Sequence, residues 1–287
     1  MRIYLTALLL CFAMTLINAK EGYKFTVPKV FKLGETIRLD IHSPEPLKKG
    51  SAILRNKKFT LFKKGEKGNH YYGYLGMSRH AKPGLYTLKI YLDEGKEKAY
   101  LKKIKIQVTD PKFGKGKVVL RGKKKKLVKK TTQLKDEGKI IGQKFRTLTA
   151  KQYFNEPFAV PVNGRVTSTF GKLRSYTGKW PNRHSGVDLA SEKGDIINAP
   201  NAGRIILSEM FPVHGETVMI DHGLGVITIY NHLSKRLVKE GKSVKKGDPI
   251  GRMGQTGLAS GVHVHWGMSI QNIRVDPLFW VNNGFFQ

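Results

Sequence analysis

Cysteine is almost absent from this sequence of 287 residues, which contains only Cys11. A single cysteine excludes a disulfide framework and any zinc site built from cysteine thiolates. Acidic residues are also scarce, with 21 Asp and Glu against 52 Lys and Arg, so the formal net charge is +31. This excess favours a polyanionic partner, and nucleic acid is the first one to consider.

Long apolar runs are confined to the first 19 residues, MRIYLTALLLCFAMTLINA. Arg2 supplies a short positive segment, Leu5 to Leu16 an apolar one, and Ala19 a small residue at its end. This pattern is typical of a secretory signal peptide over residues 1–19, cleaved after Ala19, with an uncleaved anchor as the alternative. We therefore expect an exported, periplasmic protein. Export weakens the nucleic-acid interpretation, because cell-wall polymers and lipid headgroups are the polyanions met outside the cytoplasm.

Residues 20–110 show the alternating pattern of strands. Apolar residues recur at every second position in Thr36–Ile41, in Tyr86–Leu92 and in Ile104–Val108. Period two means one buried face and one wet face, as in an antiparallel sheet. Short strands separated by Gly and Pro turns predict an accessory domain of immunoglobulin-like β-sandwich type.

Residues 111–152 form a basic linker in this interpretation. Positions 111–135 carry eleven Lys and Arg and no acid, so this stretch should stay solvated or form an exposed hairpin. Residues 134–152 contain helix formers and predict a connecting helix. The charge is concentrated in this front half, because residues 153–287 hold 15 basic and 10 acidic residues. We expect peripheral contact with an anionic wall or membrane surface through residues 111–135.

Residues 153–287 combine dense glycine with short apolar runs, which predicts a second domain of antiparallel strands. Six of the nine histidines lie between His184 and His265. His184 and Asp188 are four residues apart and can meet one metal ion, with Gly186 permitting a bend, although this spacing is common by chance. His263 and His265 would share one face of a strand, and two surface histidines are the alternative.

A catalytic zinc site uses three protein ligands and leaves a position for water. His184, Asp188 and one histidine of the His263–His265 pair can supply such a set. His232 follows an apolar run and could be structural, or it could join the remaining histidine in proton transfer.

At these residues the sequence resembles the lysostaphin-type (LytM-like) zinc metallopeptidases, which cut peptide cross-links of bacterial peptidoglycan. The resemblance covers about 130 residues and extends beyond the histidines. The matching stretches are Pro161–Gly171, Gly194–Pro200, Ala202–Ile205, Asp221–Gly223, Tyr230–Leu233 and Gly251–Gly257.

The resemblance implies that His184, Asp188 and His265 bind one Zn²⁺ and that His232 and His263 are the catalytic, non-ligand histidines. It also implies a metallopeptidase domain over residues 153–287, preceded by an amino-terminal β module seen in Gram-negative members. Zinc in such a site lowers the pKa of water towards about 7 and polarises the scissile carbonyl. The two catalytic histidines would then orient the water and relay its proton.

The function implied is a zinc-dependent endopeptidase acting on peptidoglycan stems and cross-links, at a D-alanine–diaminopimelate bond. A carboxypeptidase that trims stem peptides and a non-catalytic wall-binding activator are the alternatives. No nucleic-acid motif is present, so we expect no nucleic-acid partner, and we expect a monomer. A further hypothesis is that the front domain or the linker covers the zinc cleft until it is displaced.

Overall fold

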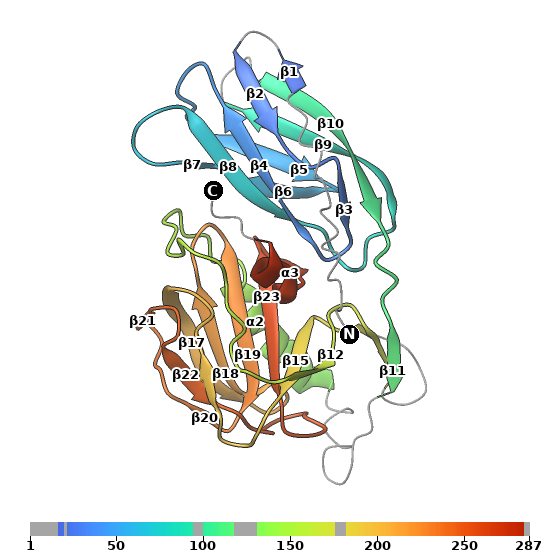
Figure 1. Cartoon of the computed structure of the whole chain (residues 1–287), viewed down its shortest axis with the longest axis vertical. Helices are drawn as coiled ribbons and strands as arrows, with labels where there is room; N and C mark the ends of the chain where they lie inside the picture. The colour runs from blue at the N-terminus through green and yellow to red at the C-terminus, as the bar shows by residue number, and fades with distance from the viewer. Residues whose placement is uncertain (1–16, 20–21, 94–99, 118–130, 176–181, 284–287) are drawn as a thin grey trace, which may run out of the picture.

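The computed structural model of the chain describes residues 17–19, 22–93, 100–117, 131–175 and 182–283. Strands dominate these residues and form two β-rich bodies placed end to end (Figure 1). The mainly β fold class predicted from the sequence is confirmed. Within these ranges no helix is both long enough and apolar enough to span a bilayer. Most of the predicted signal peptide falls outside the described residues, and its last three form a short strand.

Two five-stranded sheets face each other across one apolar core in the upper body of Figure 1. Their strand orders are β1-β2-β4-β8-β7 and β3-β10-β9-β5-β6, and only β3 and β10 pair in parallel. The arrangement is a β-sandwich, and its immunoglobulin type stays a prediction. The strands are β1 (Ile17–Ala19), β2 (Tyr23–Thr26), β3 (Val30–Lys32), β4 (Thr36–His42), β5 (Gly50–Leu54), β6 (Lys57–Thr60), β7 (Phe62–Lys63), β8 (His70–Gly76), β9 (Gly84–Leu92) and β10 (Tyr100–Thr109).

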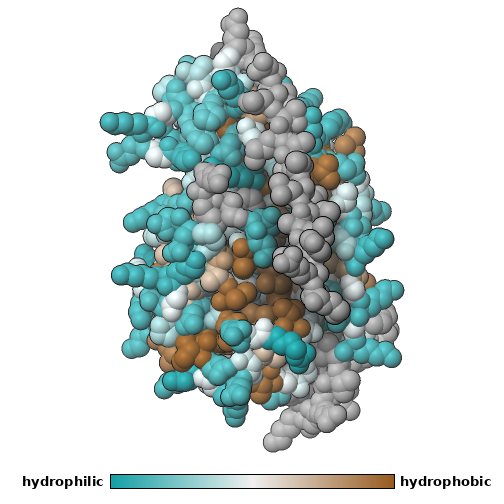
Figure 2. All heavy atoms as spheres, viewed as in Figure 1, coloured by the Kyte–Doolittle hydropathy of each residue, from teal (hydrophilic) through white to brown (hydrophobic). Residues whose placement is uncertain are grey.

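The period-two pattern explains which residues fill this core. In β4 the side chains of Ile37, Leu39 and Ile41 are at most 2% exposed, while the polar residues between them lie nearer the surface. Alternate residues of β9 and β10 are buried in the same way. Hydrophilic side chains dominate the face of this body that Figure 2 presents, whereas apolar ones gather over part of the lower body.

The lower body is built on an eight-stranded sheet. Seven strands follow the order β12-β15-β23-β19-β18-β17-β21, and β24 pairs with β23. Two small sheets, β11-β13-β14 and β16-β22-β20, complete it. The elements are β11 (Lys115–Lys117), β12 (Arg165–Ser168), β13 (Leu173–Ser175), β14 (Asn182–Arg183), β15 (Gly186–Ala190), β16 (Ile196–Asn198), β17 (Gly203–Phe211), β18 (Gly215–Asp221), β19 (Val226–Leu233), β20 (Lys235–Arg236), β21 (Ser243–Val244), β22 (Pro249–Arg252), β23 (Val264–Ile270), β24 (Ile273–Val275) and α3 (Pro277–Asn282).

The connecting helix is present as α2 (Thr131–Lys144), and the prediction that it extends to residue 152 is wrong. The helix ends in tighter turns, because the amides of Arg146 and Thr147 bond to carbonyls three residues back. Ile141 and Phe145 of α2 pack in a buried cluster with residues of β17, β18 and β19. Glu137 accepts hydrogen bonds from the amides of Val213 and His214. The helix therefore belongs to the lower body's packing.

The basic linker also contributes a strand to the lower body. β11 pairs in parallel with β13, with Lys115 opposite Leu173 and Lys117 opposite Ser175. This part of the linker is therefore neither an exposed hairpin nor simply solvated. The run of basic residues at 118–130 lies outside the described residues, so the prediction for that run remains open.

A buried aromatic cluster joins the two bodies. Tyr72 and Tyr74 of β8 pack with Phe154, Phe158 and Trp280 of the lower body. The ring centroids of Tyr74 and Trp280 are 5.0 Å apart, with the rings edge to face. The Trp280 indole donates a 3.0 Å hydrogen bond to the hydroxyl of Thr36. Because this cluster is apolar and nearly inaccessible to water, the two bodies are packed as one unit.

Candidate metal centre and catalytic pocket

The pairing of β15 with β23 brings the predicted ligands together. Asp188 lies directly opposite His265 in this antiparallel pair, and His184 lies two residues before the start of β15. Two positions before Asp188, a Cβ on Gly186 would come within 2.3 Å of the Trp266 carbonyl oxygen. Gly186 was expected to permit a bend, and the structure shows that it permits this close approach of the two strands.

Three ligand atoms form an almost equilateral triangle. His184 Nε2 and His265 Nδ1 are 2.9 Å apart, and Asp188 Oδ1 lies 3.0 Å from the former and 2.9 Å from the latter. All three residues are less than 9% exposed. Two imidazole nitrogens and one carboxylate oxygen at these separations can all face one zinc ion, whose ligand distances are about 2.0–2.2 Å. The donor set therefore fits Zn²⁺.

Neighbouring groups orient these ligands. The Thr169 carbonyl oxygen lies 2.9 Å from His184 Nδ1, so Nδ1–H donates to it and the Nε2 lone pair points into the triangle. Arg174, which is 16% exposed on its side chain, donates to Asp188 Oδ2 and leaves Oδ1 for the triangle. The sequence analysis did not identify Arg174, because its position ten residues before His184, in a strand of only three residues, gives no periodic signal.

Burial and mutual contact set the charges of the cluster. Burial lowers the pKa of His184, with an opposing contribution from its hydrogen bond to Asp188. Burial lowers the pKa of His265 to about 3. Burial alone would raise the pKa of Asp188, but hydrogen bonds with His184 and His265 outweigh it and hold that pKa well below its usual range. At neutral pH the cluster thus holds two neutral imidazoles and a carboxylate, which are the protonation states that bind metal.

His232 and His263 lie beside this triangle. Their ring centroids are 5.1 Å apart. His232 Nδ1–H donates to the Thr256 carbonyl at 2.9 Å, and His263 Nδ1–H donates to the Gly261 carbonyl at 2.9 Å. These backbone hydrogen bonds use Nδ1 of each ring and do not involve Nε2. Burial lowers the pKa of His232 well below its ordinary value, and the nearby His263 and His265 lower it further.

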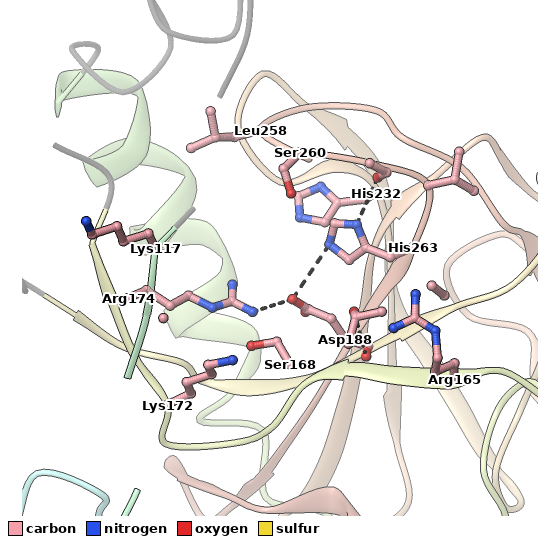
Figure 3. Close-up of a pocket in the computed structure, with 15 residues that line it drawn as sticks. Lys117, Arg165, Ser168, Lys172, Arg174, Asp188, His232, Leu258, Ser260 and His263 are labelled. Atoms are coloured by element: carbon pink, nitrogen blue, oxygen red, sulfur yellow. Dashed lines mark hydrogen bonds and ion pairs between the residues drawn. The ribbon is translucent and has the colours of Figure 1, made fainter. Parts of the chain in front are cut away.

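A pocket of about 500 Å³ opens over these side chains (Figure 3). It is lined by Gly116, Lys117, Arg165, Thr167, Ser168, Lys172, Arg174, Asp188, Ala190, His232, Leu258, Ser260, Gly261, Val262 and His263. Because His232, His263 and Asp188 reach its wall, a molecule bound in the pocket would lie beside the candidate metal site. No described residue of 20–110 is among those lining it, whereas the linker strand β11 is. Occlusion by the linker stays a prediction.

A family model described as peptidase family M23 matches residues 182–277, the range that holds all five predicted site residues. The C-terminal region belongs to peptidase family M23. This result confirms the predicted family, since the lysostaphin-type enzymes named from the sequence are M23 peptidases. The matched range contains the clustered histidines. It does not include the upper body of Figure 1.

The M23 domain aligns with curated relatives over part of their length. It is 32% identical over 122 residues to the peptidoglycan DD-endopeptidase ShyA of Vibrio cholerae, spanning 42% of this chain and 28% of ShyA. It is 35% identical over 135 residues to the DD-carboxypeptidase/endopeptidase Mpg of Neisseria meningitidis, spanning 46% of this chain and 30% of Mpg. The chain thus covers less than a third of each of these two relatives.

A similarity in structure extends beyond the M23 domain. A crystal structure of an M23 peptidase from Pseudomonas aeruginosa superposes with a TM-score of 0.64 at 26% identity, covering 89% of this chain and 95% of that one. The upper body and the M23 domain therefore occur together in a second protein.

The other histidines lie outside the pocket. His222, expected to be structural, is fully buried between the Ala202 carbonyl and the Thr228 hydroxyl. Asp221 accepts a hydrogen bond from the hydroxyl of Thr149. Neither His222 nor Asp221 lines the pocket, and the structural role expected for them stays a prediction.

Proposed function

We propose that the M23 domain is a zinc-dependent endopeptidase that hydrolyses peptide cross-links of bacterial peptidoglycan. The observation that carries this proposal is the buried triangle of His184, Asp188 and His265 with two further histidines at the same pocket. The name of ShyA, a peptidoglycan DD-endopeptidase, supports peptidoglycan as the substrate class.

In this proposal His184, Asp188 and His265 hold the metal. Zinc bound there supplies a Lewis acid that lowers the pKa of water and polarises a carbonyl. His232, kept neutral by burial, offers its Nε2 as a proton acceptor, because its Nδ1–H is committed to Thr256. His263 has the same arrangement towards Gly261 and lies on the Asp188 side of the pocket. The pair can accept a proton from water and return one to the leaving amine.

Arg174 acts on the metal centre through Asp188. Its guanidinium neutralises part of the carboxylate charge and fixes which oxygen faces the triangle. It is therefore a positioning residue in this proposal, while His232 and His263 are the catalytic residues.

The proposal also specifies which peptide bond is hydrolysed. We favour a D-alanine–diaminopimelate cross-link. A carboxypeptidase acting on stem peptides is the second candidate, because the Mpg name joins both activities. A wall-binding activator without catalysis is a weaker third candidate, because all five site residues are present. The proposal also places the protein in the periplasm as a monomer, with peripheral contact to an anionic surface through residues 111–135.

Digestion of isolated sacculi, followed by mass analysis of the released fragments, tests the activity and the bond. We expect metal-loaded protein to release un-cross-linked stems, and we expect a chelator to stop the release and added zinc to restore it. Release of terminal D-alanine alone would favour the carboxypeptidase. Unchanged sacculi with tight binding would favour the activator, and unchanged release in chelator would contradict the zinc assignment.

A further inference from the structure

The catalytic pocket has a strongly basic wall. Lys117, Arg165, Lys172 and Arg174 line it, and the single acid among the lining residues is Asp188. Figure 3 places Lys117, Lys172 and Arg174 on one side of Asp188 and Arg165 on the other. Cations therefore flank the candidate metal site on two sides.

Most of this positive charge is not neutralised within the described residues. Arg174 pairs with Asp188. Lys117, Arg165 and Lys172 have no hydrogen-bond or ion-pair partner on their side chains in the part of the chain that the structure describes. Three cations around one pocket repel one another, and an anionic ligand bound between them would reduce this repulsion.

The linker strand fixes the position of two of these cations. β11 places Lys117 beside β13, and Lys172 directly precedes β13. A Cβ on Gly116 would lie 2.6 Å from Cε of Lys172, so the absence of a side chain at position 116 lets Lys172 extend across β11. The basic wall is thus built by the pairing of the linker with the M23 domain.

We infer that this wall binds carboxylates of the peptide substrate that are not part of the cleaved amide bond. The inference rests on the proposed function and narrows its substrate to peptides with at least two free carboxylates. One carboxylate would lie against Lys117 and Lys172, and a second against Arg165. A charge-assisted bond to a carboxylate is roughly twice as strong as a neutral one, so this wall favours acidic over amidated peptides.

Paired synthetic stem peptides, with free or amidated carboxyl groups, test the inference on the metal-loaded full chain. We expect the free acid to have a kcat/KM at least about tenfold higher, which corresponds to about 1.4 kcal/mol. Lys117→Gln and Lys172→Gln should each reduce this ratio about threefold or more, mainly through KM. The matched control Lys193→Gln, an exposed lysine outside the pocket, should leave the ratio unchanged.

A measurement of peptide affinity distinguishes failure of this inference from failure of the proposed function. Fluorescence anisotropy with the two labelled peptides reports on the wall even if no bond is cut. Tighter binding of the acid that is lost in Lys117→Gln and Lys172→Gln would support the wall. Equal affinities for acid and amide would overturn it, whatever the hydrolysis assay shows.

A different surface, the outer face of the sheet β3-β10-β9-β5-β6, supports a second inference. Lys103 lies opposite Lys89, Lys89 opposite Ile53, and Ile53 opposite Lys58, so one row across four strands holds three lysines. Lys105 extends the positive charge along β10. We call the surface formed by Lys58, Lys89, Lys103 and Lys105 the lysine face. No Asp or Glu occurs in these five strands.

The lysine face also carries exposed aliphatic side chains. Val30, Gln107 and Leu85 align in one row, with Val30 53% and Leu85 63% exposed. Leu101, further along β10, is 42% exposed. Like charges directly opposite each other in a sheet destabilise the fold. Leucine side chains that stay exposed to water contribute no hydrophobic stabilisation to it. Lysines interleaved with aliphatic groups match an anionic lipid surface, which offers both charge and an apolar layer.

We propose that the lysine face docks on an anionic bilayer. Co-sedimentation of the full chain with phosphatidylglycerol-rich and with pure phosphatidylcholine vesicles tests this. We expect binding to the anionic vesicles only, at least about tenfold weaker in Lys89→Gln/Lys103→Gln because each surface lysine contributes about 1 kcal/mol. Lys193→Gln/Lys242→Gln removes the same charge elsewhere and should bind more tightly than the first double variant.

The aliphatic rows give an independent measure. Leu85→Ser should weaken vesicle binding while leaving retention on a sulfated polysaccharide resin unchanged. Equal binding of the two double variants, or retention on the resin without vesicle binding, would overturn the bilayer as the partner.

Discussion

Alanine in place of His265 is expected to abolish both metal binding and hydrolysis. The variant removes one of three ligand atoms that lie within 3.0 Å of each other and leaves Oδ1 of Asp188 with His184 as its remaining imidazole contact. A site reduced to two protein ligands should hold zinc too weakly to survive purification. Metal content measured per chain, beside hydrolysis of the same preparation, gives the result.

His232→Ala should lose hydrolysis and keep metal binding. His232 is not part of the triangle, so zinc content should stay near one per chain, while the loss of a proton acceptor should lower kcat by about 10²–10⁴-fold. His80→Ala, at an exposed position outside the pocket, serves as the control for removing a histidine. Full activity of His232→Ala would contradict its catalytic role, and loss of zinc in that variant would contradict the ligand assignment.

Trp280→Ala should destabilise the whole chain by about 3–5 kcal/mol, because it empties a fully buried aromatic site. It also removes the hydrogen bond to Thr36 across the two bodies. Since Tyr74, Phe154 and Phe158 pack around this indole, we expect wild-type protein to unfold in one transition and the variant to show partial separation of two.

Denaturant titration followed by fluorescence and circular dichroism measures this. Met210→Ala removes an exposed apolar side chain and should change the free energy of unfolding by less than about 0.5 kcal/mol. Two well-separated transitions in the wild-type protein would show that the aromatic cluster does not couple the bodies.

Local patterns were sufficient for much of the fold. The alternation in β4, β9 and β10 predicted which side chains fill the upper core, because period two leaves one choice of buried face. The metal cluster was predictable for a different reason. His184 and Asp188 are four residues apart, which suggested a shared metal ion, and the family resemblance singled out His265 over His263 as the third ligand.

Contacts between distant segments were not predictable in the same way. Phe154, Phe158 and Trp280 have no shared period, and nothing local indicates that they meet Tyr74 from another sheet. Arg174 reaches Asp188 from β13, a strand of a different sheet, and no local pattern indicates that contact. The helix α2 was placed too far towards the C-terminus, since helix formers continue past Lys144 while the backbone there tightens and turns away.

The pairing of β11 with β13 decides which residues a transferable M23 domain must include. A fragment starting at residue 153 contains the family match and all five site residues, yet it lacks the strand carrying Lys117 and the helix that packs on β17 to β19. Fused to another protein, that fragment would carry the metal cluster without the side of the pocket that Lys117 lines. A transferable unit would have to begin before β11, so the segment between the two bodies is structurally part of the lower body.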